Sequence, residues 1–214
     1  MGLFNLFHKE KTNNEKDGIH GNNAEIEKKD LLSIPCDYDG YELFDTEYMD
    51  LKLFSEINAI ITNGRFDLDA LQEYGAALEN KGDDLFGELC EAWLDRMHEE
   101  DFLVYLDGMI SMKDFVERVN STLNRIGAEV SLDVTGLTEE YRNELEEYSL
   151  KGKKISSEIN YDVLQSNLAA KELRKYGYEL ICLFDGFDNN DKAIIPVDKI
   201  EAMKAIEEKM NERA

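Results

Sequence analysis

Three consecutive stretches between residues 45 and 100 carry apolar side chains at the spacing of an α-helix. Glycine-containing breaks separate them, so the connections are short and the predicted helices should pack side by side. The predicted buried stripes are Leu53, Phe54, Ile57 and Ile61; then Leu68, Leu71, Tyr74 and Leu78; then Leu85, Phe86, Leu89, Trp93 and Met97.

The pattern then changes to short apolar runs. Continuous runs at 102–106 and 180–184 predict buried β-strands, and each is followed by Asp-Gly, a turn signal. A short run at 193–195 predicts a third strand that ends at a proline. Alternating apolar and polar residues at 130–134 predict a strand with one solvated face.

Helical patterns lie between and after these strands. Ser111 and Asp114 predict a capped start for a helix over 112–126, an acidic helix begins at Thr138, and two more helices follow. The fold class predicted is α+β, with a helical N-terminal half and helices on one face of a small mixed β-sheet. Residues 1–30 predict a flexible tail, and residues 31–214 a single domain.

The charge balance excludes several classes of partner. Lys and Arg total 24 and Asp and Glu total 47, so the formal net charge is −23. Such a field repels phosphate backbones and anionic lipid, which disfavours nucleic acid. A basic protein partner, a cation or plain solubility fits the charge better. The oligomeric state is left open.

Cysteine usage and hydropathy predict a cytoplasmic protein. The three cysteines, Cys36, Cys90 and Cys182, are far apart and odd in number, which favours reduced thiols over a disulfide framework. No apolar run approaches the ~20 residues of a membrane span. Phosphate-binding and dinucleotide-binding glycine motifs do not occur, so no cofactor and no metal is predicted.

Two regions of the second half carry a family resemblance. The run 102–107 with the helix at 112–126, and the run 176–185 with Ile194-Ile195-Pro196 after an acidic turn, resemble a bacterial family, domain of unknown function 6630. The chain departs from the family where Gly108-Met109 replace Trp-Lys, and where 189–192 replace a Ser-Asp-Ser-Tyr type of turn. The resemblance implies an architecture and no reaction.

The candidate site consists of strand-end acids. Asp107 and Asp185 each follow a buried run and precede a glycine. If the two strands are neighbours with the same direction, both carboxylates project at one edge of the sheet, where they could bind a divalent cation or act as acid and base. Asp188 and Asp191 extend this acidic cluster. The alternative is that each Asp simply opens a turn through its own backbone hydrogen bonds.

Histidine chemistry is sparse in the folded part of the chain. His98, at the end of the third predicted helix, is expected to be a structural cation at a helix C-terminus. The predicted function is therefore a protein-binding or regulatory module without catalysis. The alternatives are a carboxylate-based or divalent-metal-dependent enzyme at the strand-end acids, and a purely structural protein whose acidity serves solubility.

Overall fold

The computed structural model describes residues 50–80, 83–106, 110–150, 161–183 and 191–212. The predicted tail at 1–30 lies outside these ranges. The α-helices are α2 (Leu51–Ile61), α3 (Gln72–Asn80), α4 (Asp83–Glu99), α5 (Met112–Arg125), α6 (Val134–Leu150), α8 (Tyr161–Arg174) and α9 (Ile200–Asn211). The strands are β1 (Val104–Tyr105), β2 (Tyr178–Cys182) and β3 (Asp191–Pro196), and the short 3₁₀ turns are η1 (Leu68–Ala70) and η2 (Val197–Lys199).

The α+β class is confirmed, and the sheet has three strands in the order β1-β3-β2. Both outer strands pair antiparallel with β3, with Tyr105 opposite Asp191 and Cys182 opposite Lys192. The sheet is therefore antiparallel where a mixed one was expected. A mixed sheet would have followed if β1 and β2 were direct neighbours with the same direction. In the structure, β1 and β2 each pair with β3 instead.

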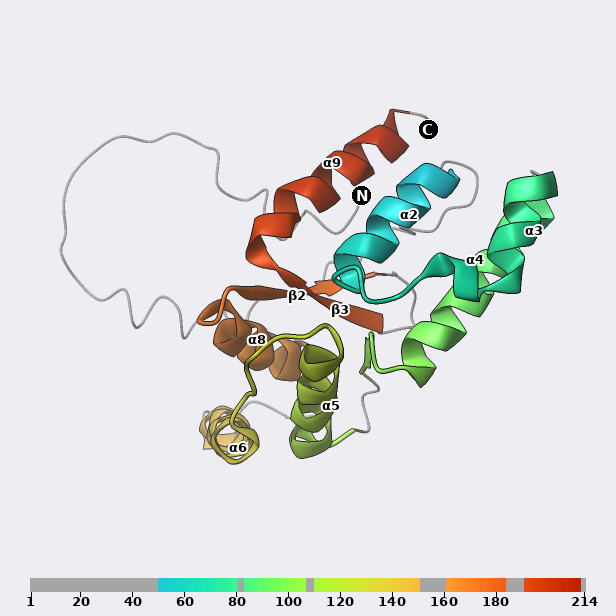
Figure 1. The fold of residues 1–214 in the computed structure, drawn as a ribbon. Helices are drawn as coiled ribbons and strands as arrows, with labels where there is room; N and C mark the ends of the chain where they lie inside the picture. Colours follow the sequence, from blue (N-terminus) through green and yellow to red (C-terminus); the bar gives the residue numbers. More distant parts are fainter. Residues whose placement is uncertain (1–49, 81–82, 107–109, 151–160, 184–190, 213–214) are drawn as a thin grey trace, which may run out of the picture.

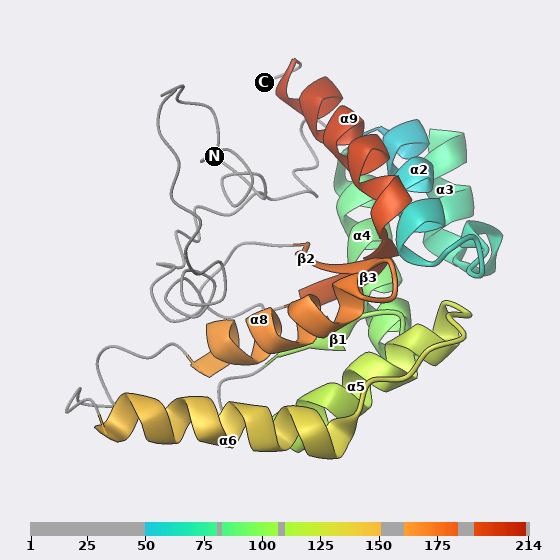
Figure 2. The same cartoon turned by 90° about the vertical axis from the view of Figure 1, so that its left-hand side faces the viewer.

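Helices cover both faces of this sheet rather than one. Figures 1 and 2 show α2 and α9 on one side, with α3 and α4 beyond them, and α5, α6 and α8 on the other. The physical reason is the composition of β3, in which every residue from Asp191 to Ile195 is buried. Successive side chains of a strand point to opposite faces, so a strand buried throughout needs cover on both sides.

The predicted strand at 130–134 is wrong. Residues 130–133 are irregular, and α6 begins at Val134 rather than at Thr138. The Asn120 side chain explains the alternation, because its Nδ2 donates to Leu132 O (3.0 Å) and its Oδ1 accepts from Leu132 N (2.7 Å). A side-chain amide thus takes the place of a neighbouring strand.

The second predicted helical stripe is only partly confirmed. Leu68 and Leu71 are buried, but Leu78 is 49% exposed. The chain leaves helical geometry at Leu71, which is extended between η1 and α3 (φ −96°, ψ 126°). Because α3 starts again at Gln72, the 3.6-residue period changes phase, and Ala77 is buried in place of Leu78.

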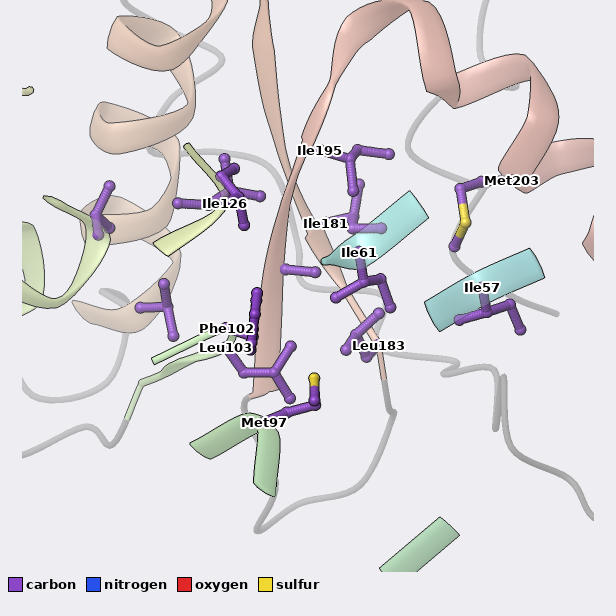
Figure 3. Packing of buried hydrophobic residues seen from close by; sticks show 14 of the residues in the cluster. Ile57, Ile61, Met97, Phe102, Leu103, Ile126, Ile181, Leu183, Ile195 and Met203 are labelled. Atoms are coloured by element: carbon purple, nitrogen blue, oxygen red, sulfur yellow. The ribbon is translucent and has the colours of Figure 1, made fainter. Parts of the chain in front are cut away.

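One hydrophobic core runs from Leu53 in α2 to Met210 in α9. Figure 3 shows Ile181 and Ile195 of the sheet gathered with Ile57, Ile61 and Met203 of the covering helices. Trp93 is fully buried, and its ring meets Phe54 edge-on at 5.7 Å.

Asn58 provides the polar centre of this core. Its Oδ1 accepts from Trp93 Nε1 (2.8 Å), and its Nδ2 donates to Phe66 O (3.0 Å). Thr62 Oγ1 donates to the Asn58 carbonyl (2.7 Å). These buried groups are therefore paired with one another, and the pairing fixes α4 against α2.

The outer edge of β2 is closed by an ion pair. Arg174, at the end of α8, donates from Nε to Glu179 Oε2 (2.7 Å) and from Nη2 to Glu179 Oε1 (3.0 Å). The same Oε1 accepts from Leu180 N (3.3 Å), which belongs to the strand. Arg174 is half exposed whereas Glu179 is buried.

Candidate functional site

The structure places one of the four predicted acids. Asp107, Asp185 and Asp188 lie outside the described residues, and Asp191 is the first residue of β3. Strands β1 and β2 do share a direction, since both are antiparallel to β3. They are not neighbours, because β3 lies between them, and next-but-one strands are about 10 Å apart. The shared carboxylate site stays a prediction.

Asp191 is paired with a histidine. His98 lies in the last turn of α4, and its Nε2 is 3.0 Å from Asp191 Oδ1. The carboxylate side chain is only 7% exposed, while the imidazole is 35% exposed. Tyr105 lies opposite Asp191 in the sheet, and its ring meets the imidazole edge-on at 6.1 Å. The pair therefore joins the end of a helix to the end of the sheet.

The charge of this carboxylate favours protonated His98. The polar contact with Asp191 raises the pKa of the imidazole, burial lowers it, and the charges of Asp191 and Asp95 raise it further. The positive charge of Arg118 lowers the pKa of the imidazole. The guanidinium of Arg118 is held in place because its Nη1 donates to Tyr105 O (3.0 Å). The net effect is a raised pKa for His98, and its largest cause is the Asp191 carboxylate.

The contact between the two residues is short without being an aligned hydrogen bond, and it is an ion pair when His98 is protonated. Asp191 Oδ1 is buried, and it accepts no hydrogen bond of good geometry from the described residues. A buried carboxylate oxygen is costly to leave uncompensated. The imidazole of His98 at 3.0 Å supplies this compensation when it is protonated, the state that the carboxylate favours.

A second polar pair lies on the opposite face of the same strand. Lys192 follows Asp191, so its side chain points to the other side of the sheet. It is only 1% exposed, and its Nζ donates to Cys182 Sγ at 3.1 Å. Cys182 is the last residue of β2 and lies directly opposite Lys192 in the register. Two polar pairs thus occupy adjacent positions at one end of the sheet.

Sequence reasoning missed both pairs. His98 and Asp191 lie far apart in the chain, and nothing in the local pattern connects them. Lysine is among the residues least often buried, so Lys192 reads as a solvent-facing residue at the start of a strand. The pairing of Cys182 with Lys192 follows from the register of β2 and β3, which the structure shows and the local sequence pattern does not state.

The exposed face of α4 carries a stripe of acids. Glu88, Glu91, Asp95 and Glu99 are all exposed, and their spacing of three and four residues places them on one side of the helix. Glu99 pairs with Arg96 at 3.0 Å. The other three have no ion pair with a described residue. Residues 66–101 contain twelve Asp and Glu against two Lys and Arg, a net charge of −10.

The described part of the chain contains no group of three His, Cys, Asp or Glu residues arranged to hold a metal ion. None of its helices has the length and apolar character required to cross a membrane. Comparison of the chain with protein-family models, with curated proteins and with solved structures finds no match. The resemblance of the second half to a bacterial family stays a prediction.

Proposed function

We propose that the protein is a binding or regulatory module that docks on a basic surface of another protein through the outer face of α4. The observation that carries this proposal is the acidic stripe: Glu88, Glu91 and Asp95 are exposed on one side of α4 and form no ion pair with a described residue, although the Asp95 charge also acts on His98. Like charges on one helix face repel, so they weaken the helix when the protein is alone. A basic surface on a partner would neutralise these carboxylates and remove the repulsion between them. Its attraction for them would also speed association.

The helix beside α4 adds an apolar contact. Leu78 of α3 is the most exposed of the large hydrophobic side chains among the described residues, at 49%. Helices α3 and α4 pack on each other, as Figure 1 shows. Protein interfaces combine an apolar centre with a polar rim, and an exposed leucine on the helix that packs against α4 is our candidate for the apolar part.

Two matched triple variants test the location of this surface. In the first, Glu88→Lys, Glu91→Lys and Asp95→Lys reverse the stripe. In the second, Glu129→Lys, Glu139→Lys and Glu146→Lys make the same change in net charge at exposed positions outside α4. The full-length chain and both variants serve as bait in a lysate of the source cells, and the captured protein is then purified for titration.

The expected result is a basic protein captured by the wild type and by the second variant. Its affinity for the α4 variant should be at least about tenfold weaker, and its affinity for the wild type should fall as salt rises. Capture of no basic protein, or an equal loss of affinity in both variants, would contradict the proposal. Circular dichroism of each variant checks that the helices remain.

The proposal also places the protein in the cytoplasm. Cys90 and Cys182 are free thiols, in keeping with a compartment that maintains cysteines in the reduced state.

An enzyme that uses the strand-end carboxylates is the second candidate. It is favoured by the direction of β1 and β2, which end at the same end of the sheet as Asp191. Calorimetric titration with calcium and magnesium chloride separates the two candidates. A binding module should give no heat above dilution, and saturable heat that Asp191→Asn abolishes would favour the metal-dependent enzyme.

A further inference from the structure

Lys192 is an unusual residue for the interior of a small sheet. Its side chain belongs to β3 and is 1% exposed. An ammonium group removed from water costs several kcal/mol unless a partner compensates it. Among the described residues, its hydrogen-bond partner is the Cys182 sulfur at 3.1 Å, and a thiol is a weak acceptor. The pair is therefore a poor device for stability.

The backbone holds these two side chains together. Cys182 and Lys192 are opposite one another in the antiparallel register of β2 and β3, so their Cβ atoms project from the same face. The adjoining backbone hydrogen bond, from Leu183 N to Asp191 O (3.0 Å), fixes this register. Sulfur and nitrogen are thus kept in contact without any further ordering of the chain.

The environment of Cys182 differs from that of the other described cysteine. Cys90 is buried in α4, and its burial, with a smaller effect of the Glu91 charge, raises the pKa of its thiol to about 12. Such a thiol is inert because thiolate is the reactive form. Cys182 is only partly buried, so part of this residue remains exposed to solvent.

We infer that Cys182 and Lys192 form an oxidative modification site, in which a peroxide links them through a covalent sulfur–nitrogen bond. Hydrogen peroxide first takes two electrons from the Cys182 sulfur, giving the sulfenic acid and one water. The Lys192 nitrogen, once it has released a proton to solvent, then attacks that sulfur with its lone pair. The S–O bond breaks, a proton leaves the nitrogen, and a second water departs. The protein loses two hydrogen atoms, and the peroxide is reduced to water.

The bridge would join the end of β2 to the start of β3. It converts a cross-strand contact into a covalent crosslink and removes the charge of a buried ammonium. A thiol reductant reverses it, because attack on the sulfur returns the amine and the Cys182 thiol. The site is therefore a reversible response to peroxide, independent of the acidic surface proposed for partner binding.

Peptide mass spectrometry tests this inference on the full chain carrying Cys36→Ser. The protein is treated with hydrogen peroxide, alkylated and digested with trypsin. The bridge blocks cleavage after Lys192, so the expected product is a looped peptide spanning 176–199 that is about 2 Da lighter than its reduced form. Treatment with dithiothreitol should restore the normal peptide. Cys90 should remain reduced and serves as an internal control.

Two variants separate the bridge from simple oxidation. Lys192→Arg retains the positive charge without a nucleophilic amine, and Lys192→Met fills the site with an apolar chain should the arginine variant fail to fold. In both, Cys182 should gain about 16 Da or more instead of losing 2 Da. A wild-type Cys182 that also gains oxygen, or that resists peroxide altogether, would overturn the inference.

Discussion

Two buried polar clusters in this protein differ in how completely they are paired. Around Asn58, the side-chain amide joins Trp93 and Phe66 through well-formed hydrogen bonds of 2.8 and 3.0 Å. At the end of the sheet, by contrast, Asp191 Oδ1 relies on the charge of His98, and Lys192 donates to a thiol. The first cluster lies among helices, whereas the second lies where three strands meet.

This difference in pairing suggests that the Asn58 cluster stabilises the fold and that the cluster at the end of the sheet has another role. A satisfied buried network specifies one packing of the core, because any other arrangement leaves a polar group without a partner. An incompletely satisfied cluster costs stability, and a role in binding or redox chemistry is one explanation for its presence. Asn58 therefore belongs to the fold, while the residues around Asp191 and Lys192 are where modification or binding should be sought.

The largest effect is expected from Asn58→Ala. This change removes the partners of Trp93 Nε1 and Phe66 O and leaves a small cavity, so the free energy of unfolding should fall by about 3 kcal/mol. Urea denaturation measures it. Thr62→Val is the matched control, because the Asn58 carbonyl keeps its backbone hydrogen bond from Thr62 N, and it should cost about 1 kcal/mol or less. If both variants lost the same free energy of unfolding, the Asn58 side chain would contribute no more to stability than an ordinary buried contact.

An effect of opposite sign is expected from Lys192→Met. Methionine has a similar length and no charge to desolvate, so the free energy of unfolding should stay constant or rise by up to about 2 kcal/mol. The same urea series measures it. A loss of more than about 1 kcal/mol would show that Lys192 stabilises the sheet, and the two clusters would then no longer differ in kind.

The smallest effect concerns the pH dependence of stability. Since the folded-state pKa of His98 is raised, its contribution is complete below the unfolded-state pKa of about 6.5 and is lost as the pH rises through the folded-state pKa. The amount should be below about 1 kcal/mol, because the imidazole is 35% exposed and solvent screens the pair.

Asp191→Asn is the corresponding variant. It should bring the imidazole pKa, followed by NMR titration, back toward its usual value, and it should flatten the dependence of stability on pH above 6.5. His98→Gln controls for the loss of the titrating group and should abolish the dependence. An unchanged imidazole titration in Asp191→Asn would place the source of the shift elsewhere.

Local patterns predicted the helices well and the long-range pairs poorly. The start of α5 at Ser111 was predictable, because the hydroxyl accepts from Asp114 N (3.1 Å) three residues away. The buried stripe of α2 follows from spacing within a single helix. By contrast, the alternation around Leu132 imitates a strand because Asn120 supplies the partner, which spacing cannot distinguish from a neighbouring strand.

The candidate site was predicted only at the level of its place in the fold. The position of Asp191 at a strand end follows from the apolar run and turn beside it. The pairing of His98 with Asp191 depends on how α4 packs against the sheet. Lys192 is buried because helices cover both faces of the sheet. The sequence pattern of a single strand does not indicate how many faces of its sheet are covered.

The ion pair at the outer strand has a consequence for behaviour at high concentration. A second molecule that added a strand beside β2 would need the amide of Leu180, which Glu179 already occupies. To reach that amide, the second molecule would have to displace the Glu179 carboxylate, which accepts two hydrogen bonds from Arg174. Both charged groups would then lie unpaired in the new interface. Unwanted growth of the sheet into aggregates is thereby discouraged by one arginine and one glutamate.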